Sequence, residues 1–224
     1  ASGRTYQSFN PATGEVIATI AKGGAEDVGA ACAAAQAAFE GEWGAMDGAS
    51  RGKIITRAAD LIMERLDELA ELETLDVGKP ITETKNIDIP VSASYLHWYG
   101  EVCLDNLGEQ IPLPTGAQVD FSLRQPYGVV AGIAPWNFPL FLGILKIAPA
   151  LAMGNSVVIK PASITSISTF CGGTPSAAAT AIWSIVGPCD PKRIQQRDPS
   201  NRTSASSGSI GAWARYGARY SALI

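Results

Sequence analysis

The run Tyr127-Gly128-Val129-Val130-Ala131-Gly132-Ile133-Ala134 and the run Ser156-Val157-Val158-Ile159-Lys160 flank a longer apolar stretch, Phe138 to Met153. The two short runs are rich in valine and isoleucine and have the length of buried strands, whereas the longer stretch has the length of a helix. Gly154-Asn155 supplies a helix stop. Strand, helix and strand in this order form a βαβ unit, which predicts parallel pairing and a right-handed crossover. We therefore predict an α/β fold.

Helices are expected ahead of this unit. A stripe of apolar residues predicts a helix over residues 25–39, and Ser50 is the expected N-cap of a long helix whose apolar positions recur as far as Leu72. Gly78-Lys79-Pro80 should end this helical region, and Pro90 should begin a further helix. Between that helix and the βαβ unit we expect a loop over residues 108–114 and a strand over residues 118–124.

The regular patterns stop after Thr169. Residues 170–224 are dominated by Gly, Ala, Ser and Arg, and no window keeps a helical or strand period for long. We therefore divide the chain into a folded region, residues 1–169, and an aberrant tail of low order, residues 170–224. The simplest hypothesis for the tail is a shifted reading frame in the coding sequence.

Composition excludes several classes of function. The chain has 224 residues, a net charge of -4 and no basic run that could neutralise phosphates, so nucleic acid is not an expected partner. No apolar stretch is long enough to span a bilayer, and no export signal is recognisable. Its four cysteines are widely scattered, which indicates a reducing, cytoplasmic location. With a single histidine, His97, the chain cannot form a multi-histidine metal site.

Asn137 is the most informative polar residue. It follows the first predicted strand and precedes the helix, at the edge where α/β sheets bind ligands. Its amide could donate a hydrogen bond to a developing oxyanion, which would be worth ~3 kcal/mol. The alternative is that Asn137 only caps the helix, as asparagine commonly does.

The chain resembles the N-terminal part of the aldehyde dehydrogenase superfamily over roughly residues 5–169. The resemblance rests on seven segments that occur in the family's order. These are Asn10 to Glu15, Gly78-Lys79-Pro80, Pro126 to Val130, Pro135 to Leu140, Lys146 to Leu151, Gly154-Asn155 and Lys160-Pro161-Ala162-Ser163. It implies N-terminal helices followed by the start of a Rossmann-like parallel-sheet dinucleotide-binding domain, truncated in this chain.

The resemblance also implies roles for particular residues. Asn137 would form the side-chain half of the oxyanion hole, and Lys160 would hydrogen-bond the adenosine ribose of NAD or NADP. Lys146 would face the active-site region. The alternatives are a solvated lysine at a strand end for Lys160 and a snorkelling side chain for Lys146. Four further residues would line the cofactor channel: Ile133, Ala134, Pro135 and Trp136.

Ser163 departs from the pattern of many NAD-preferring members, which have a glutamate at this place. A carboxylate would repel the 2′-phosphate of NADP, whereas a serine hydroxyl would not. We therefore expect this cofactor-binding position to tolerate NADP as well as NAD.

The implied activity is NAD(P)-dependent oxidation of a small-molecule aldehyde to a carboxylic acid, by an enzyme whose full-length relatives are homo-oligomeric. This chemistry needs a cysteine thiolate and a glutamate that activates water. Neither Cys171 nor Cys189 has the family's nucleophile context, and no glutamate follows Glu109. We expect the chain alone to be inactive. Two other interpretations stay open: a non-catalytic interaction protein that uses the helical face over residues 61–72 or the tail, and a different α/β oxidoreductase.

Overall fold

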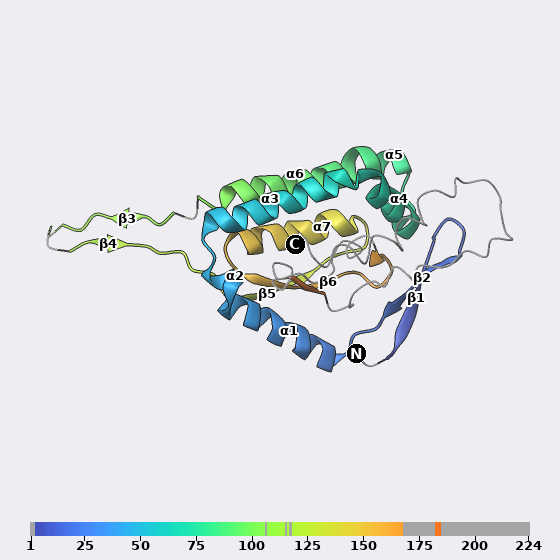
Figure 1. Cartoon of the computed structure of the whole chain (residues 1–224), viewed down its shortest axis with the longest axis horizontal. Coiled ribbons are helices and arrows are strands. Elements are labelled where there is room, and N and C mark those ends of the chain that lie inside the picture. The colour runs from blue at the N-terminus through green and yellow to red at the C-terminus, as the bar shows by residue number, and fades with distance from the viewer. Residues whose placement is uncertain (1–2, 106, 115, 117, 168–181, 185–224) are drawn as a thin grey trace.

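The computed structural model describes residues 3–105, 107–114, 116, 118–167 and 182–184. Its elements follow one another along the chain (Figure 1) as β1 Thr5–Phe9, β2 Val16–Ala21, α1 Ala25–Glu40, α2 Glu42–Ala45, α3 Gly48–Glu64, α4 Leu66–Val77, α5 Ile81–Glu83, the π-helical turn η1 Thr84–Asp88, α6 Ile89–Val102, β3 Gln110–Ile111, β4 Asp120–Phe121, β5 Val129–Ile133, α7 Pro139–Ala152, β6 Ser156–Lys160 and β7 Ile182–Ser184.

The predicted βαβ unit is present. Strands β5 and β6 pair in parallel, with Val129 opposite Ser156 and Ile133 opposite Lys160, and α7 connects them. Strand β7 pairs in parallel with the other edge of β6, which gives the order β5-β6-β7. No strand was expected beyond Thr169, so β7 corrects that part of the sequence interpretation. The rest of the predicted tail, and its proposed origin, lie outside the described residues.

Helices cover both faces of this sheet. In Figure 1, α1 lies on one face and α7 on the other, with α3 and α6 stacked beyond α7. Adjacent residues of β6 point to opposite faces, as the pleat requires. Val157 joins the large core that α7, α3 and α6 form, whereas Val158 packs against Ala31 and Ala35 of α1. Strand β6 is therefore an inner strand covered by helices on both faces, whereas the neighbouring strand β5 exposes Ala131 and Ile133.

The long helix predicted from Ser50 to Leu72 is two helices. Arg65 lies between α3 and α4 with φ -109° and ψ 24°, outside helical geometry, and separates their axes. The N-cap of α3 is Asp47 and not Ser50, because the Asp47 carboxylate accepts hydrogen bonds from the Ser50 backbone N–H at 2.8 Å and the Ser50 hydroxyl at 2.9 Å. The predicted cap, Ser50, is the donor of these hydrogen bonds, and the true N-cap, Asp47, is their acceptor.

Gly78 ends α4 as predicted. It adopts φ 81°, a left-handed conformation that favours glycine, and its backbone N–H closes the last turn on the Thr74 carbonyl at 2.9 Å. The chain then turns through α5 and η1 directly into α6, whose first residue is Ile89. Pro90 lies in the first turn of α6, directly after η1.

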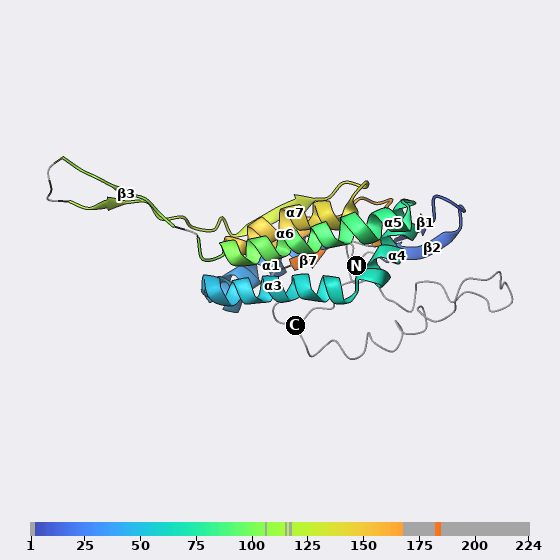
Figure 2. The same ribbon diagram turned by 90° about the horizontal axis from the view of Figure 1, so that it is seen from above.

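Strands β3 and β4 form a narrow antiparallel arm that projects from the helical layers in both views (Figures 1 and 2). Gln110 pairs with Phe121 and Ile111 with Asp120. The loop expected over residues 108–114 therefore contains a strand, and the strand expected over residues 118–124 has only two paired residues. Among the described helices, none combines the length and apolarity that crossing a membrane demands.

Candidate functional site

The segment between β5 and α7 is held at the carboxyl ends of β5 and β6. The backbone N–H of Ala134 donates to the Lys160 carbonyl at 2.9 Å, which continues the sheet by one further bond. The Thr165 hydroxyl donates to the Trp136 carbonyl at 2.9 Å, so the chain that follows β6 fixes the chain that follows β5. This is the sheet edge at which α/β proteins bind ligands.

Asn137 does not cap α7. The N-cap position belongs to Phe138, and no side chain caps the helix there. Asn137 is only partly buried, and within the described residues no hydrogen bond includes its side chain. The capping alternative for Asn137 is therefore wrong, and its amide is left available to a ligand at the sheet edge.

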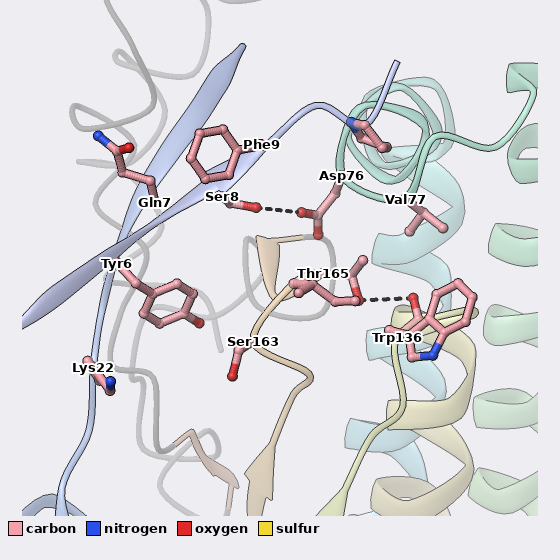
Figure 3. Close-up of a pocket in the computed structure, with 12 residues that line it drawn as sticks. Tyr6, Gln7, Ser8, Phe9, Lys22, Asp76, Val77, Trp136, Ser163 and Thr165 are labelled. Carbon is pink, nitrogen blue, oxygen red and sulfur yellow. Dashed lines mark hydrogen bonds between the residues drawn. The ribbon is translucent and has the colours of Figure 1, made fainter. Parts of the chain in front are cut away.

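A cavity of about 590 Å³ opens beside this segment (Figure 3). It brings Trp136 and Ser163 together, two of the residues predicted to bind cofactor. The β1–β2 hairpin forms the opposite wall in Figure 3. Its full lining is Tyr6, Gln7, Ser8, Phe9, Pro11, Lys22, Asp76, Val77, Trp136, Ser163, Ile164 and Thr165. Asn137, Lys146 and Lys160 are not among these residues.

The floor of the cavity depends on a buried carboxylate that sequence analysis missed. Asp76 is 1% exposed and accepts hydrogen bonds from the Ser8 hydroxyl at 3.2 Å and from the Ile167 backbone N–H at 2.9 Å. Tyr6 and Ser166 are joined through their hydroxyls at 3.2 Å, and burial raises the pKa of Tyr6. A signal was present, because Asp76 falls seven residues after the buried Leu69, on the apolar face of α4.

The two lysines predicted to act at the site are bonded to nearby backbone. The ammonium of Lys146 donates to the Leu142 carbonyl at 3.2 Å, one helical turn away, and its side-chain stem passes beside Gly132 of β5. Lys160 is exposed and donates to the Pro161 carbonyl at 2.9 Å. Of the predicted channel residues, Ile133 is 68% exposed, whereas Ala134 is 2% exposed and belongs to the protein interior.

Neither of the two cysteines in the described residues lines the cavity. Cys32 is exposed on α1. Cys103 is buried, its thiol donates to the Tyr99 carbonyl at 3.2 Å, and burial raises the pKa of the thiol despite the nearby Arg51. A neutral thiol is a poor nucleophile. Within the described residues there is also no cluster of His, Cys, Asp and Glu that could hold a metal ion.

The model of the aldehyde dehydrogenase family matches residues 1–173 of this chain. This chain belongs to the aldehyde dehydrogenase family. DhaS of Bacillus subtilis (strain 168), which carries an aldehyde dehydrogenase name, is 46% identical to it over 169 residues, covering 75% of this chain and 34% of DhaS. The chain thus spans about a third of that relative's length.

Solved aldehyde dehydrogenase structures have the same fold. The NAD+ complex of aldehyde dehydrogenase from Bacillus cereus superimposes with a TM-score of 0.75 at 34% identity, covering 86% of this chain and 40% of that one. PnpE from Pseudomonas sp. WBC-3, also solved with nicotinamide adenine dinucleotide, gives a TM-score of 0.75 at 37% identity, covering 83% of this chain and 38% of PnpE. The α/β architecture predicted from the sequence, helices followed by the start of a Rossmann-like sheet, is confirmed.

Proposed function

We propose that this chain forms the nucleotide-binding and oxyanion-stabilising side of an aldehyde dehydrogenase site, for oxidation of an aldehyde to a carboxylic acid with NAD or NADP. The observation that carries the proposal is the position of Asn137, partly buried and unbonded within the described residues, at the carboxyl end of a parallel sheet. Trp136, the next residue, borders the adjacent cavity.

Asn137 would donate its side-chain amide to the oxygen of the aldehyde as negative charge develops there. A donor fixed in advance stabilises such a charge by ~3 kcal/mol because it need not reorient during the reaction. The segment is fixed in this way, since the Trp136 carbonyl is bonded to Thr165 and the Ala134 N–H to the Lys160 carbonyl.

We assign the polar part of the dinucleotide to this cavity as part of the proposal. Its lining contains one lysine, Lys22, and one carboxylate, Asp76, which is buried and bonded to Ser8 and Ile167. No exposed carboxylate in this lining would repel a phosphate, and Ser163 offers a hydroxyl to a ribose. We therefore propose that the chain accepts both NAD and NADP. When bound, the nicotinamide supplies the hydride acceptor of the oxidation.

Covalent attack on the aldehyde needs a thiolate beside Asn137. Cys32 and Cys103 do not border the cavity, and burial raises the pKa of the Cys103 thiol. Cys171 and Cys189 lie outside the described residues. We expect the 224-residue chain to bind the cofactor without producing NADH when an aldehyde is added.

The test is calorimetric titration of the full chain with NAD and with NADP, followed by an assay for aldehyde-dependent NADH absorbance. We expect saturable binding of both dinucleotides and weaker binding by Trp136→Ala. Trp98→Ala, at an exposed tryptophan on α6 outside the cavity, is the matched control and should bind as the unchanged chain does. Failure of the unchanged chain to bind either dinucleotide would refute the proposed nucleotide site.

We also propose that the chain associates with copies of itself through the β3–β4 arm. The arm and its base carry large apolar side chains in solvent: Leu107 at 71%, Val119 at 73%, Phe121 at 58% and Leu123 at 72% exposure. Such side chains are costly to leave uncovered. Sedimentation should show a concentration-dependent oligomer that Phe121→Ser with Leu123→Ser converts to monomer. A monomeric unchanged chain would contradict this assembly.

The alternative of a non-catalytic interaction protein gains no support from the helical face over residues 61–72. Leu69 is buried in the large core, Ile62 and Leu66 pack against it, and Leu72 packs with the β1–β2 hairpin core. This face is therefore used inside the chain. A cytoplasmic location fits the free thiols of Cys32 and Cys103 and is part of the proposal, with cell fractionation as its test.

A further inference from the structure

Lys79 is a partly buried lysine that has no role in the proposed site described above. Its side chain is 13% exposed, and its ammonium lies 2.6 Å from an Asp88 carboxylate oxygen and 3.1 Å from the centre of the Phe138 ring. Phe138 directly follows Asn137. We propose that Lys79 is a positioning residue for Asn137, which it holds in place through the Phe138 ring. This inference rests on the proposed oxyanion role of Asn137.

The ion pair with Asp88 fixes the position of the Lys79 ammonium. The Asp88 side chain is fully buried at the end of η1, and its second carboxylate oxygen has no hydrogen-bond partner within the described residues. Glu83 lies farther from the ammonium, at 3.8 Å. Because Asp88 is buried and has one cationic partner, moving Lys79 would leave a buried charge uncompensated. The ammonium is therefore held at one place.

The Phe138 ring meets this ammonium with its face. A cation over an aromatic ring is attracted by the negative face of the π-system, and the attraction increases when both groups are shielded from water. Phe138 is partly buried at the N-cap of α7, and its backbone carbonyl accepts the first helical hydrogen bond from Leu142 at 2.8 Å. The ring contact therefore sets both the orientation of Phe138 and the start of α7.

The backbone on each side of Asn137 is consequently fixed by a contact of the neighbouring residue. On one side the Trp136 carbonyl is bonded to the Thr165 hydroxyl at 2.9 Å, and on the other side Lys79 holds the Phe138 ring. The Asn137 side chain itself has no hydrogen bond to a described residue. Its direction toward a ligand is thus determined by these two neighbours, and Lys79 controls one of them.

The experiment follows the Asn137 side-chain amide by NMR in the full chain labelled with ¹⁵N-asparagine. The resonance is assigned by its loss in Asn137→Asp. The test variant combines Lys79→Met with Asp88→Asn, because removing both members of a buried ion pair avoids an unpaired charge. The matched control combines Lys85→Met with Asp67→Asn, which removes an exposed pair on neighbouring elements with a separation of 2.5 Å. Lys79→Arg retains a cation over the ring.

We expect the test variant to shift the Asn137 amide resonance and to speed its exchange with water. The control pair should leave both unchanged, and Lys79→Arg should keep the signal near its original position. An Asn137 signal that is unaffected in the folded test variant would overturn the proposal, as would an equal shift in the control.

A second measurement needs no variant. If the ammonium lies over the Phe138 ring, the ring current must move the Lys79 Cε protons upfield, with cross-peaks to Phe138. Their absence would overturn the proposal even if the variants did not fold. Titration with NAD on the same samples separates the positioning role of Lys79 from the proposed function. If the unchanged chain does not bind NAD, the proposed function is wrong. The Asn137 and Lys79 signals report positioning whether or not NAD binds.

Discussion

The indole Nε1 of Trp43 donates a hydrogen bond to the backbone carbonyl of Asn155, 2.9 Å away and 112 positions along the chain. The side chain of Asn155 accepts a hydrogen bond from the Gly128 N–H at 3.1 Å and donates one to the Ala150 carbonyl at 3.1 Å. Asn155 therefore joins α2, the approach to β5 and the end of α7. The Gly154-Asn155 segment, predicted as a helix stop, is also a junction of the core.

Trp43→Phe should destabilise the chain. Trp43 is 5% exposed, and the substitution leaves the Asn155 carbonyl without its buried donor. An unsatisfied buried group costs ~1–3 kcal/mol, which urea unfolding would detect as a lower midpoint. Trp98→Phe is the control, because Trp98 is 55% exposed and surface changes usually stay within about 0.5 kcal/mol. Equal effects of the two substitutions would argue against the junction.

Gly52→Ala should destabilise the contact of α3 with α6. A methyl group at Gly52 would lie 2.5 Å from the Gly100 carbonyl oxygen, so one helix would have to move. Overpacking of this kind costs ~1–3 kcal/mol. Gly29→Ala in α1 is the matched control, since nothing lies within 4 Å of its added methyl and alanine favours a helix by up to ~1 kcal/mol. The melting temperature should fall for Gly52→Ala and rise for Gly29→Ala.

The cap at Asp47 should make stability depend on pH. Hydrogen bonds from Ser50 hold the pKa of the Asp47 carboxyl below its ordinary value of 3.8. Asp47 therefore contributes stability fully above pH 3.8, and the contribution is lost as pH falls through the lower folded pKa. Asp47→Asn keeps an acceptor that does not titrate. The difference in melting temperature between the unchanged chain and Asp47→Asn should shrink as the pH falls. A difference that stays constant would show that titration of Asp47 does not contribute to the pH dependence of stability.

Ser163→Glu should separate the two cofactors. A carboxylate at the cavity wall would repel the 2′-phosphate of NADP, and like charges about 4 Å apart in water repel by ~1 kcal/mol, so NADP binding should weaken by about fivefold. Ser163→Gln, which has similar size without charge, should affect both dinucleotides equally. Calorimetry should measure the NAD and NADP affinities of the unchanged chain, Ser163→Glu and Ser163→Gln. An equal loss of NAD and NADP affinity with glutamate would contradict the predicted role of Ser163.

Much of the fold could be predicted because local patterns and tertiary packing agree. Ser156 to Lys160 is buried on both faces in an inner strand, so its continuous apolar run indicated a strand with the observed bounds. The break at Arg65 could not be predicted, because the apolar spacing continues through it. The β3–β4 arm was largely missed because its strands are two residues long and exposed, and therefore carry no core pattern.

The cofactor-binding roles of Trp136 and Ser163 were implied by the resemblance to aldehyde dehydrogenases and stay a prediction. The two residues line one cavity. The wall contributed by the β1–β2 hairpin was not foreseen, because residues 5–9 approach residues 163–167 only after folding. Lys79 was noted as part of a helix stop and of one family segment, but no role was predicted for it, since Phe138 contacts it only after folding.

The bond of Tyr6 to Ser166 spans 160 positions, and Asp76 holds Ile167 and Ser8 together. During synthesis on the ribosome, the first hairpin must therefore wait until almost the whole described region has emerged before it can settle. Contacts this distant in sequence form late and slowly. Tyr6 is thus translated 160 positions before its partner Ser166, and it depends on a nascent chain that stays free of aggregation until that partner has been made.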